Sequence, residues 1–506
     1  MKKLVSLLMA AIMVLSMMSF ISFASAEEEI VHLKWAQGNG PAPIDNDIVV
    51  ARLNEISREA IGVEVQIDYM TSDEMQLVIA NGGEGYDIFY SCSWFNNYFD
   101  NVSKGTFANL WGKIQEWTPD LFALLPEEWW EMARSADGGL YGVVDRKDVA
   151  GINSILYDPE IAKAAGIEVP SSISAWDEMT PYLTALQSAM DADPTLGKYA
   201  VNVGGAPAGM ESSFDFIDRI PLIGVIFGTT KVVSVFDDPG VTERYYTMHK
   251  WNQMGFVNPD AATLDENSID SKLHHIGFTQ AWTGYSYYGS RGFSTEYARY
   301  AGPVLSTDLL LGSLQCISAA LEEDEARFKK ALQFLELLCT NKEYRDTIGY
   351  GIEGVHFNYY DVNDIDGNYL GKAVVRTELG RSNYAPWNFN QGNYSLLTPA
   401  FALEEVEHGH PLVNQWDLYY KEIEGAPVST IAGFQFNNQE PIDFTQAYTE
   451  IANIKAQYFS AIQCGAVDPD DPELGIPAMR AKMEAAGLND IIAEAQRQLD
   501  DYLASK

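Results

Sequence analysis

The sequence contains little of what redox, metal and phosphate chemistry require. Only four of its 506 residues are cysteines, and no two of them have the CxxC spacing of a metal or thiol redox site. There is also no G-x-x-x-x-G-K-S/T phosphate loop, no H-E-x-x-H pair and no G-x-S-x-G nucleophile elbow. The sequence therefore carries no signature of a P-loop NTPase, a zincin or an α/β-hydrolase, and we expect neither a cofactor nor a metal.

The four cysteines are too few for a disulfide framework. They are Cys92, Cys316, Cys339 and Cys464. Cys316 falls in a strand-like run and Cys339 in a helical one, and nothing in the sequence brings their sulfurs together. An exported protein could pair two of them. We expect instead that all four are unpaired and buried as small apolar side chains.

Basic residues are scarce: 33 Lys and Arg face 71 Asp and Glu, and the formal net charge is −38. Nucleic acids and anionic membranes need a basic patch, so both are poor partners for this chain. Residues 407–410, Glu-His-Gly-His, are interpreted as exposed polar residues rather than metal ligands. In the stretch 361–367, Ile365 and Asp366 stand where a calcium loop has a ligand and its turn glycine. That stretch predicts a β-hairpin turn.

The N-terminus predicts export. Lys2 and Lys3 precede an apolar run over residues 4–23, and Ala24-Ser25-Ala26 supplies the small residues that signal peptidase recognises. Three glutamates follow without a basic flank, so we expect a cleaved signal peptide over residues 1–26 and no stable membrane insertion. The first cysteine is Cys92, so no lipid-accepting cysteine stands at the cleavage site.

Strand and helix patterns alternate after the signal. Residues 30–36, 63–69 and 86–90 alternate apolar and polar side chains or form short apolar runs, as strands do. Between the first two, Val49, Leu53, Ile56 and Ala60 form a helical stripe that Gly62 ends. This order predicts an α/β protein whose loops at the carboxyl ends of the strands bind ligands.

A family resemblance rests on the order of later segments. Gly138-Gly139-Leu140-Tyr141-Gly142 leads into a strand, then into a second strand at 154–157, a helix ended by Gly166, and a helix starting near Trp176. This order resembles the inter-lobe crossing of family 1 extracellular solute-binding proteins, the capture subunits of sugar-importing ABC transporters. The helical runs 444–462 and 489–503 are similar to the C-terminal module of a carbohydrate-associated subgroup.

The resemblance implies a two-lobe, periplasmic-binding-protein-like α/β fold of type II with a helical C-terminal extension. Lobe 1 is expected over residues 27–146 and 316–352. Lobe 2 is expected over residues 147–315 and 353–506, including a helical module at about 434–506. Three crossings, near residues 144–146, 315–316 and 352–354, would let a monomer close on its ligand by hinge motion.

Aromatic residues clustered with polar ones indicate the ligand. Sugar rings stack their C–H faces on aromatic rings, and their hydroxyls need amide or charged partners. Three clusters, at 94–98, 280–288 and 384–391, mix both types, whereas Trp129-Trp130 lies in a helical segment and predicts core packing. From these clusters and the expected crossings, the predicted ligand-binding residues are Asn39, Trp94, Asn96, Asn97, Asp145, Arg146, Trp282, Tyr285, Glu353, His356, Trp387 and Asn390.

The resemblance predicts a non-enzymatic protein that captures a carbohydrate, most simply an oligosaccharide, and delivers it to permease subunits. The main alternative is a secreted glycoside hydrolase or lyase, which would need two carboxylates roughly 5–10 Å apart across the scissile bond. The sequence marks no such pair, and Asp87, Asp145 and Glu353 each fit structural or hydroxyl-binding roles. A surface adhesion or scaffold protein is disfavoured because no repeat or anchor is evident.

Overall fold

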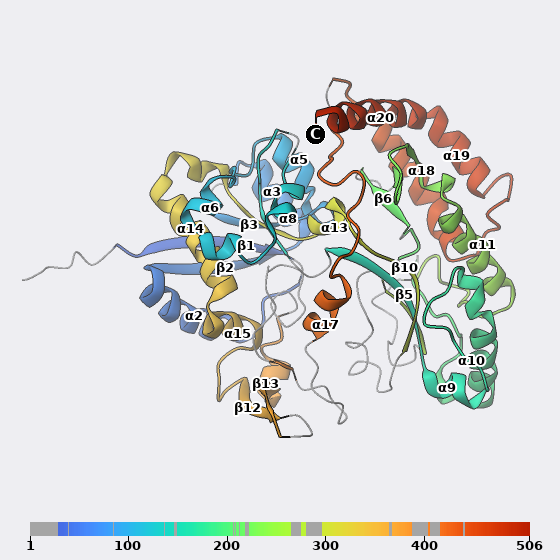
Figure 1. Cartoon of the computed structure of the whole chain (residues 1–506), viewed down its shortest axis with the longest axis horizontal. Coiled ribbons are helices and arrows are strands. Elements are labelled where there is room, and N and C mark those ends of the chain that lie inside the picture. Colours follow the sequence, from blue (N-terminus) through green and yellow to red (C-terminus); the bar gives the residue numbers. More distant parts are fainter. Residues whose placement is uncertain are drawn as a thin grey trace, which may run out of the picture.

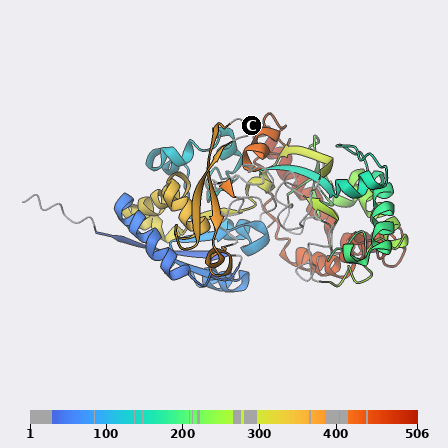
Figure 2. The ribbon, with the colours of Figure 1, turned by 90° about the horizontal axis from the view of Figure 1, so that it is seen from below.

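Two lobes lie side by side in the computed structural model (Figure 1), and a view from below shows the same separation (Figure 2). Within the described residues, no helix is both long enough and apolar enough to cross a bilayer. All four cysteines are buried, and none of them forms a disulfide bond, as predicted. The structure describes residues 29–505 apart from 39, 84, 136, 146–148, 206, 208, 212, 218–221, 265–274, 280–295, 364–366, 387–402, 405–414 and 439–440.

Lobe 1 is built on a five-stranded sheet with the order β2-β1-β3-β11-β4. The first strand pairs in parallel with the second and third, which suits strands connected through helices. Strand β11, which comes late in the sequence, runs antiparallel to its two neighbours β3 and β4. The strands are β1 (Val31–Gly38), β2 (Val63–Met70), β3 (Ile88–Ser91), β4 (Val143–Val144) and β11 (Leu314–Ile317).

Helix α2 (Asn46–Ile61) shows how the sequence sets these elements. Val49 and Leu53 point into the core one turn apart, and Gly62 ends the helix in the left-handed conformation at φ 66°. The other helical segments of lobe 1 are α3 (Ser72–Ala80), α4 (Ser93–Asn96), α5 (Tyr98–Ser103), α6 (Lys113–Trp117), α7 (Pro119–Phe122), α8 (Glu127–Met132), η7 (Ala319–Glu323), α14 (Glu325–Thr340) and α15 (Lys342–Tyr350).

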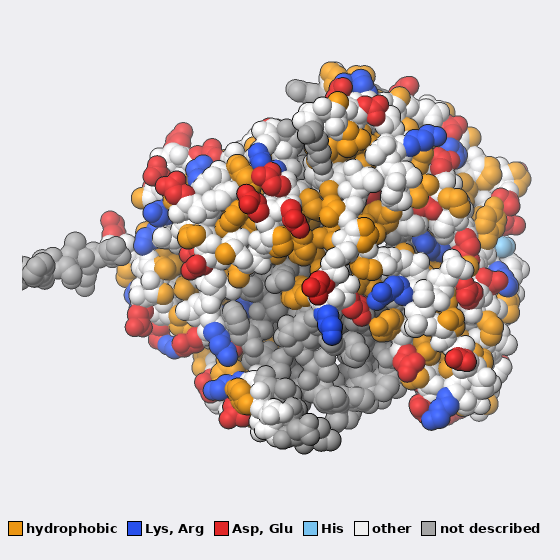
Figure 3. Space-filling view, viewed as in Figure 1, with side chains coloured by type: hydrophobic (Ala, Val, Ile, Leu, Met, Phe, Trp, Pro, Cys, Tyr) orange, Lys and Arg blue, Asp and Glu red, His pale blue; other side chains and the backbone are white. Residues whose placement is uncertain are grey.

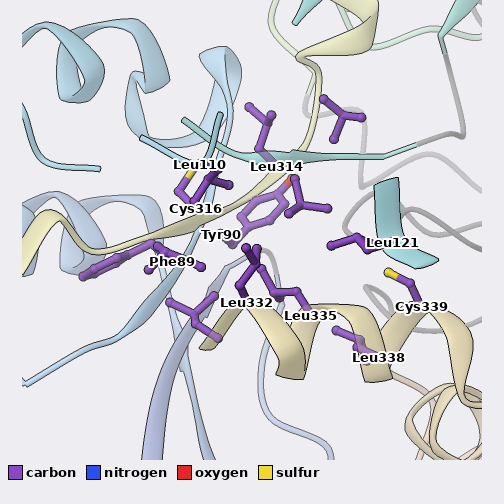
Figure 4. Close-up of a cluster of buried hydrophobic side chains, with 14 of the residues drawn as sticks. Phe89, Tyr90, Leu110, Leu121, Leu314, Cys316, Leu332, Leu335, Leu338 and Cys339 are labelled. Carbon is purple, nitrogen blue, oxygen red and sulfur yellow. The ribbon is translucent and has the colours of Figure 1, made fainter. Parts of the chain in front are cut away.

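The core of lobe 1 joins segments from both ends of its sequence. Phe89 and Tyr90 of β3 and Cys316 of β11 pack over Leu332 and Leu335 of α14 (Figure 4). All five side chains are buried. Residues more than 200 positions apart therefore form one hydrophobic core, which makes lobe 1 a single folding unit despite its interrupted sequence.

Lobe 2 contains two three-stranded sheets, ordered β10-β5-β9 and β6-β7-β8. Helices cover them, and the indole rings of Trp176 and Trp251 stack at 6.1 Å in the core. The strands are β5 (Ala150–Tyr157), β6 (Phe214–Phe216), β7 (Ile223–Ile226), β8 (Val232–Ser234), β9 (Ile276–Thr279) and β10 (Glu296–Leu305). The helical segments are α9 (Pro159–Ala164), η1 (Trp176–Met179), α10 (Thr180–Ala192), η2 (Pro194–Leu196), η3 (Val235–Asp237) and α11 (Pro239–Gln253).

The C-terminal segment is helical, as the sequence predicts. It contains α18 (Thr445–Gln463), α19 (Ile476–Ala485) and α20 (Leu488–Ser505). Ile462, Met479 and Leu499, one from each helix, are buried in the core of lobe 2. The tail is therefore part of lobe 2 rather than an appendage.

Three chain segments join the lobes, and they lie next to one another. Along β5, Ile152 belongs to the core of lobe 1 and Ile155 to the core of lobe 2, and β10 returns antiparallel beside it. On the other edge of β10, Leu305 N–H donates to Pro427 O at 2.9 Å, and Ser429 N–H donates to Leu305 O at 2.8 Å. The three crossings therefore form one narrow ribbon.

The crossings differ from their predicted positions. The first two lie within β5 and before Leu305, because residues 149–152 and 305–314 pack in the core of lobe 1. The predicted third crossing at 352–354 is wrong. Tyr384, Tyr419 and Ile423 still pack in the core of lobe 1, and the chain reaches the core of lobe 2 only at Ile431 and Phe434.

Residues 353–386 consequently pack on lobe 1 rather than on lobe 2. The Tyr384 hydroxyl donates to Ile348 O at 3.0 Å, and that of Tyr359 donates to Asp346 at 2.8 Å. Figures 1 and 2 both show the hairpin of this segment beside lobe 1.

The remaining elements are α13 (Thr307–Leu310), between β10 and β11, and then β12 (Phe357–Asn363), β13 (Tyr369–Arg376), α16 (Glu378–Ser382), β14 (Leu403–Glu404) and α17 (Gln415–Glu422). The antiparallel pairing of β12 with β13 confirms the predicted hairpin.

Candidate functional site

A groove of about 890 Å³ opens at the carboxyl ends of β1 and β2. These ends point from lobe 1 toward lobe 2 (Figure 1). Its volume falls within the usual range for small-molecule sites, and ligands of open α/β sheets bind at this edge. The groove is lined by residues 40–42, Asn46, Asp47, residues 67–71, Glu74 and Phe95.

Two aromatic side chains form part of the groove. Tyr69 is the penultimate residue of β2 and is half-buried, and Phe95 packs edge-on against Tyr90 at a centroid distance of 5.3 Å. A Cβ atom at Gly38 would lie 2.5 Å from the ring of Phe95. Glycine at the end of β1 is therefore what lets Phe95 lie against the strand. The arrangement exposes ring surface at the edge of the sheet.

Polar groups surround these rings. Thr71 and Glu74 form a capping box at the start of α3, with Thr71 N–H donating to the Glu74 carboxylate at 2.9 Å. The hydrogen bonds from Thr71 lower the pKa of Glu74, so this carboxylate stays charged near neutral pH. The side-chain oxygen of Asn46 is buried and accepts no hydrogen bond. It is an acceptor that a ligand hydroxyl could satisfy.

The predicted residues Asn96 and Asn97 lie beside the groove with different surroundings. Asn96 is fully buried; its amide donates to Tyr90 O at 2.8 Å and accepts from the Ser91 hydroxyl at 2.7 Å. These bonds hold the turn that follows β3. Asn97 is exposed, and its left-handed conformation at φ 55° joins α4 to α5. Asn96 therefore positions the loop that carries Trp94 and Phe95.

His356 is also enclosed within lobe 1. Its Nδ1 accepts from Ile352 N–H at 2.9 Å, so the proton is on Nε2, which donates to Asp45 at 3.2 Å. The hydrogen bonds from His356 and then Asn383 lower the pKa of Asp45. This bond ties the turn after α15 to the start of α2. Glu353, on the same turn, is exposed.

Asp145 lies in lobe 1, before the first crossing. It is buried at the end of β4, and its N–H donates to Ser313 O at 3.2 Å. Trp94 belongs to α4, but its side chain lies outside the described part of the structure. Six other predicted residues lie wholly outside the described residues: Asn39, Arg146, Trp282, Tyr285, Trp387 and Asn390. Their roles stay predictions.

The sequence did not single out Asn46 or Tyr69. Asn46 follows the cap of α2, and Tyr69 continues the alternating pattern of β2, so each has an ordinary structural explanation. The signal that could have identified them is position: both stand at the carboxyl edge of neighbouring parallel strands, where ligand-contacting residues gather.

Known proteins resemble the chain over nearly its whole length. A family model described as a domain of unknown function, DUF3502, matches residues 430–504. A carbohydrate ABC transporter substrate-binding protein of Streptococcus pneumoniae is 24% identical over 476 residues, covering 92% of this chain and 90% of that protein. The crystal structure of the N-glycan transport solute binding protein NgtS from S. pneumoniae has a TM-score of 0.76 at 22% identity, covering 94% of this chain and 99% of that one. NgtS in complex with Man5GlcNAc has a TM-score of 0.70 at the same identity and coverage.

These similarities confirm the α/β two-lobe fold of type II and the predicted resemblance to extracellular solute-binding proteins. The DUF3502 match spans the three helices α18 to α20.

Proposed function

We propose that this chain is the solute-binding subunit of an ABC importer and captures an oligosaccharide between its two lobes. The observation that supports this most directly is the joint: two lobes with separate cores are connected by three adjacent chain segments. Such a joint allows the lobes to rotate as rigid bodies around a ligand that contacts both. The carbohydrate-transport relative and the glycan complex of NgtS support a sugar as that ligand.

The groove of lobe 1 supplies one half of the proposed site. Tyr69 and Phe95 offer ring faces for stacking, and the Asn46 oxygen offers an acceptor for a sugar hydroxyl. Asn39 and Trp94 are chain neighbours of the lining residues Gly40 and Phe95, so we retain both as ligand contacts. We also retain Arg146, Trp282, Tyr285, Trp387 and Asn390 as ligand contacts, on the sequence argument alone.

Capture without chemistry is the better proposal for this groove. Glu74 is held charged by its bonds to Thr71, which makes it a poor general acid. A secreted glycosidase remains the alternative, and it would be recognised because it converts the sugar into a product.

We further propose that the chain is exported through its N-terminal signal, acts as a monomer, and delivers its ligand to permease subunits.

A glycan panel tests the proposal. Wild-type protein should gain thermal stability with at least one oligosaccharide, because a ligand at 100-fold over its Kd adds about 2.7 kcal/mol. Titration calorimetry should then yield an isotherm, and chromatography should recover the sugar unchanged. Recovery of shorter sugars would favour the glycosidase. Absence of any stabilising glycan would overturn the carbohydrate proposal.

Two substitutions locate the site. Trp94→Ala should weaken binding by about 1–3 kcal/mol through loss of one stacked ring. Asn46→Ala should weaken ligand binding by about 1 kcal/mol, which is the usual contribution of one hydrogen bond. Tyr369→Ala is the matched control, because that aromatic is 61% exposed on the β12–β13 hairpin and outside the groove. Equal affinity in all three variants would show that the ligand binds elsewhere.

A further inference from the structure

A small cavity lies where the second and third crossings meet both lobes. Its volume is about 40 Å³, enough for a few water molecules. Two carboxyl groups line it: Asp215 from β6 in lobe 2 and Asp308 from α13, which follows the second crossing. Phe99, from α5 of lobe 1, lines the same cavity together with Phe216 and Ile217 of lobe 2.

Asp215 is bonded directly to the ribbon of crossings. Its carboxylate accepts a short hydrogen bond from the Ser429 hydroxyl, and Ser429 N–H is in turn bonded to Leu305 O. One turn further on, Gly433 N–H donates to Thr307 Oγ1 at 2.6 Å, next to Asp308. The ionisation of this pair therefore acts on the segments about which the lobes would rotate.

Besides α13, lobe 1 closes the cavity through Phe99 and Ser135. Phe99 contributes its ring to the lining, and the Ser135 hydroxyl donates to Gln435 Oε1 at 3.3 Å. Gln435 belongs to the segment that leaves the third crossing and also lines the cavity. Rotation of lobe 1 would therefore separate Phe99 and Ser135 from that segment and let water reach the carboxyl groups.

The lining offers the carboxyl groups no positive charge. Among its described residues the only other titratable group is the phenol of Tyr448, from α18, and the segment 431–438 contributes the uncharged amides of Gln435 and Asn438. Burial raises the pKa of Asp215 to about 7, and the charge of Asp308 adds to that rise while the Ser429 bond opposes it. Asp308 is only half-buried, and this burial raises its pKa to about 6. The two groups share one cavity, so they titrate as a pair.

We propose that Asp215 and Asp308 form a proton-sensitive joint between the lobes. Protonated, the pair stabilises the arrangement in which Phe99 covers the cavity; deprotonated, it favours hydration of the cavity and rotation of lobe 1 away from β6. The pair thus sets the balance between two lobe arrangements, whatever ligand the groove binds.

The direction of the pH effect follows from the linkage between proton binding and lobe opening. In an opened cavity the carboxyl groups return toward their ordinary pKa of about 4 and release protons. The covered arrangement therefore has its full advantage below about pH 4 and loses it as pH rises to about 7. The opening equilibrium should rise by up to about tenfold per pH unit for each proton released, and should level off above about pH 7.

The test uses the full chain without sugar, so its outcome does not depend on the proposed function. Small-angle scattering should give a larger radius of gyration at about pH 7.5 than at about pH 5, and hydrogen exchange, corrected for intrinsic rates, should show α13 and residues 431–438 losing protection over that interval. Asp215→Asn and Asp308→Asn, which imitate the protonated forms, should each remove part of this dependence, and the double variant should remove it.

Two further variants make the result specific. Asp361→Asn changes an exposed carboxylate on β12 and should behave as wild type. Phe99→Ala admits water from the lobe 1 side and should move the transition to lower pH without changing either carboxyl group. An unchanged radius and unchanged protection in wild type between these pH values would overturn the proposal. So would a full pH dependence in the double variant, or a transition in Phe99→Ala at the wild-type pH.

Discussion

The two lobes differ in where their cores come from. Lobe 1 begins with strands and helices that follow one another within the first third of the chain, and later segments, among them β11 and α14, complete it. Lobe 2 has two three-stranded sheets, and its C-terminal helices α18, α19 and α20 contribute Ile451, Ile462, Met479 and Leu499 to its core. Lobe 1 is therefore a sheet completed by helices, whereas lobe 2 is a helical assembly that depends on the end of the chain.

Removal of the C-terminal helices should have the largest effect, because it should destabilise lobe 2 and leave lobe 1 folded. A stop codon in place of Asp443 deletes α18, α19 and α20 and exposes the surface they cover. We expect lobe 2 to lose cooperative unfolding while lobe 1 survives limited proteolysis as a resistant fragment. A stop at Ala504, which removes three residues, is the control. A resistant lobe 2 fragment in the longer truncation would contradict the comparison.

Two buried tryptophans offer the next contrast. Trp130 in lobe 1 and Trp176 in lobe 2 are both fully buried, so either alanine substitution should cost about 3–5 kcal/mol. Substitution by phenylalanine, which removes the indole N–H but keeps an aromatic ring, should distinguish the two positions. The indole N–H of Trp130 donates to Phe122 O at 2.8 Å, whereas that of Trp176 has no partner. Trp130→Phe should therefore cost about 1–2 kcal/mol more than Trp176→Phe in urea unfolding. Equal costs would show that the hydrogen bond contributes nothing.

The carboxyl group of Asp215 should make the stability of lobe 2 depend on pH. Its pKa is about 7 in the fold and about 4 in the unfolded chain, so wild type loses stability as pH rises between these values. Asp215→Asn removes that loss. The stability of the variant relative to wild type should be about 2–3 kcal/mol greater at about pH 8 than at about pH 5. A difference that stays constant across this interval would mean that Asp215 is charged in the fold at both pH values.

The smallest effect should come from the cap of α3 in lobe 1. Thr71→Ala removes one half of the capping box and should cost about 1 kcal/mol. It should also raise the pKa of Glu74, since the bonds from Thr71 keep that carboxylate charged. Ser103→Ala, on an exposed residue at the end of α5, is a suitable control for the lost hydroxyl. Identical melting temperatures for Thr71→Ala and wild type would contradict the expectation.

Local patterns predicted lobe 1 well. Alternation identified β1 and β2, the Val49–Leu53 stripe identified α2, and Gly62 marked its end. Trp129 and Trp130 are buried, as a helical core segment requires. In each case the local sequence was enough to predict the element, because the spacing of apolar residues shows which face of a strand or helix is buried.

Long-range contacts account for what the sequence did not predict. The chain remains on lobe 1 after residue 353 because Asn383 and His356 bind Asp45, more than 300 positions earlier. No periodicity encodes such a pairing. Likewise, Asn96 and His356 look like sugar contacts by residue type, but their hydrogen bonds are made inside lobe 1. The buried Asn46 oxygen, which accepts no hydrogen bond, is recognised only when the structure places Asn46 in the lining of the groove.

The last helix ends close to the boundary between the lobes. The Tyr502 hydroxyl donates to Ala432 O at 2.7 Å, and a Cβ atom on the next residue, Gly433, would lie 3.9 Å from Met132 O in lobe 1. A fluorescent protein fused after the chain end would therefore be carried by lobe 2 yet start beside lobe 1. Paired with a dye on an exposed position of lobe 1, such as Leu77, it would report relative rotation as a change in energy transfer. The architecture thus lends itself to an optical sensor of lobe rotation.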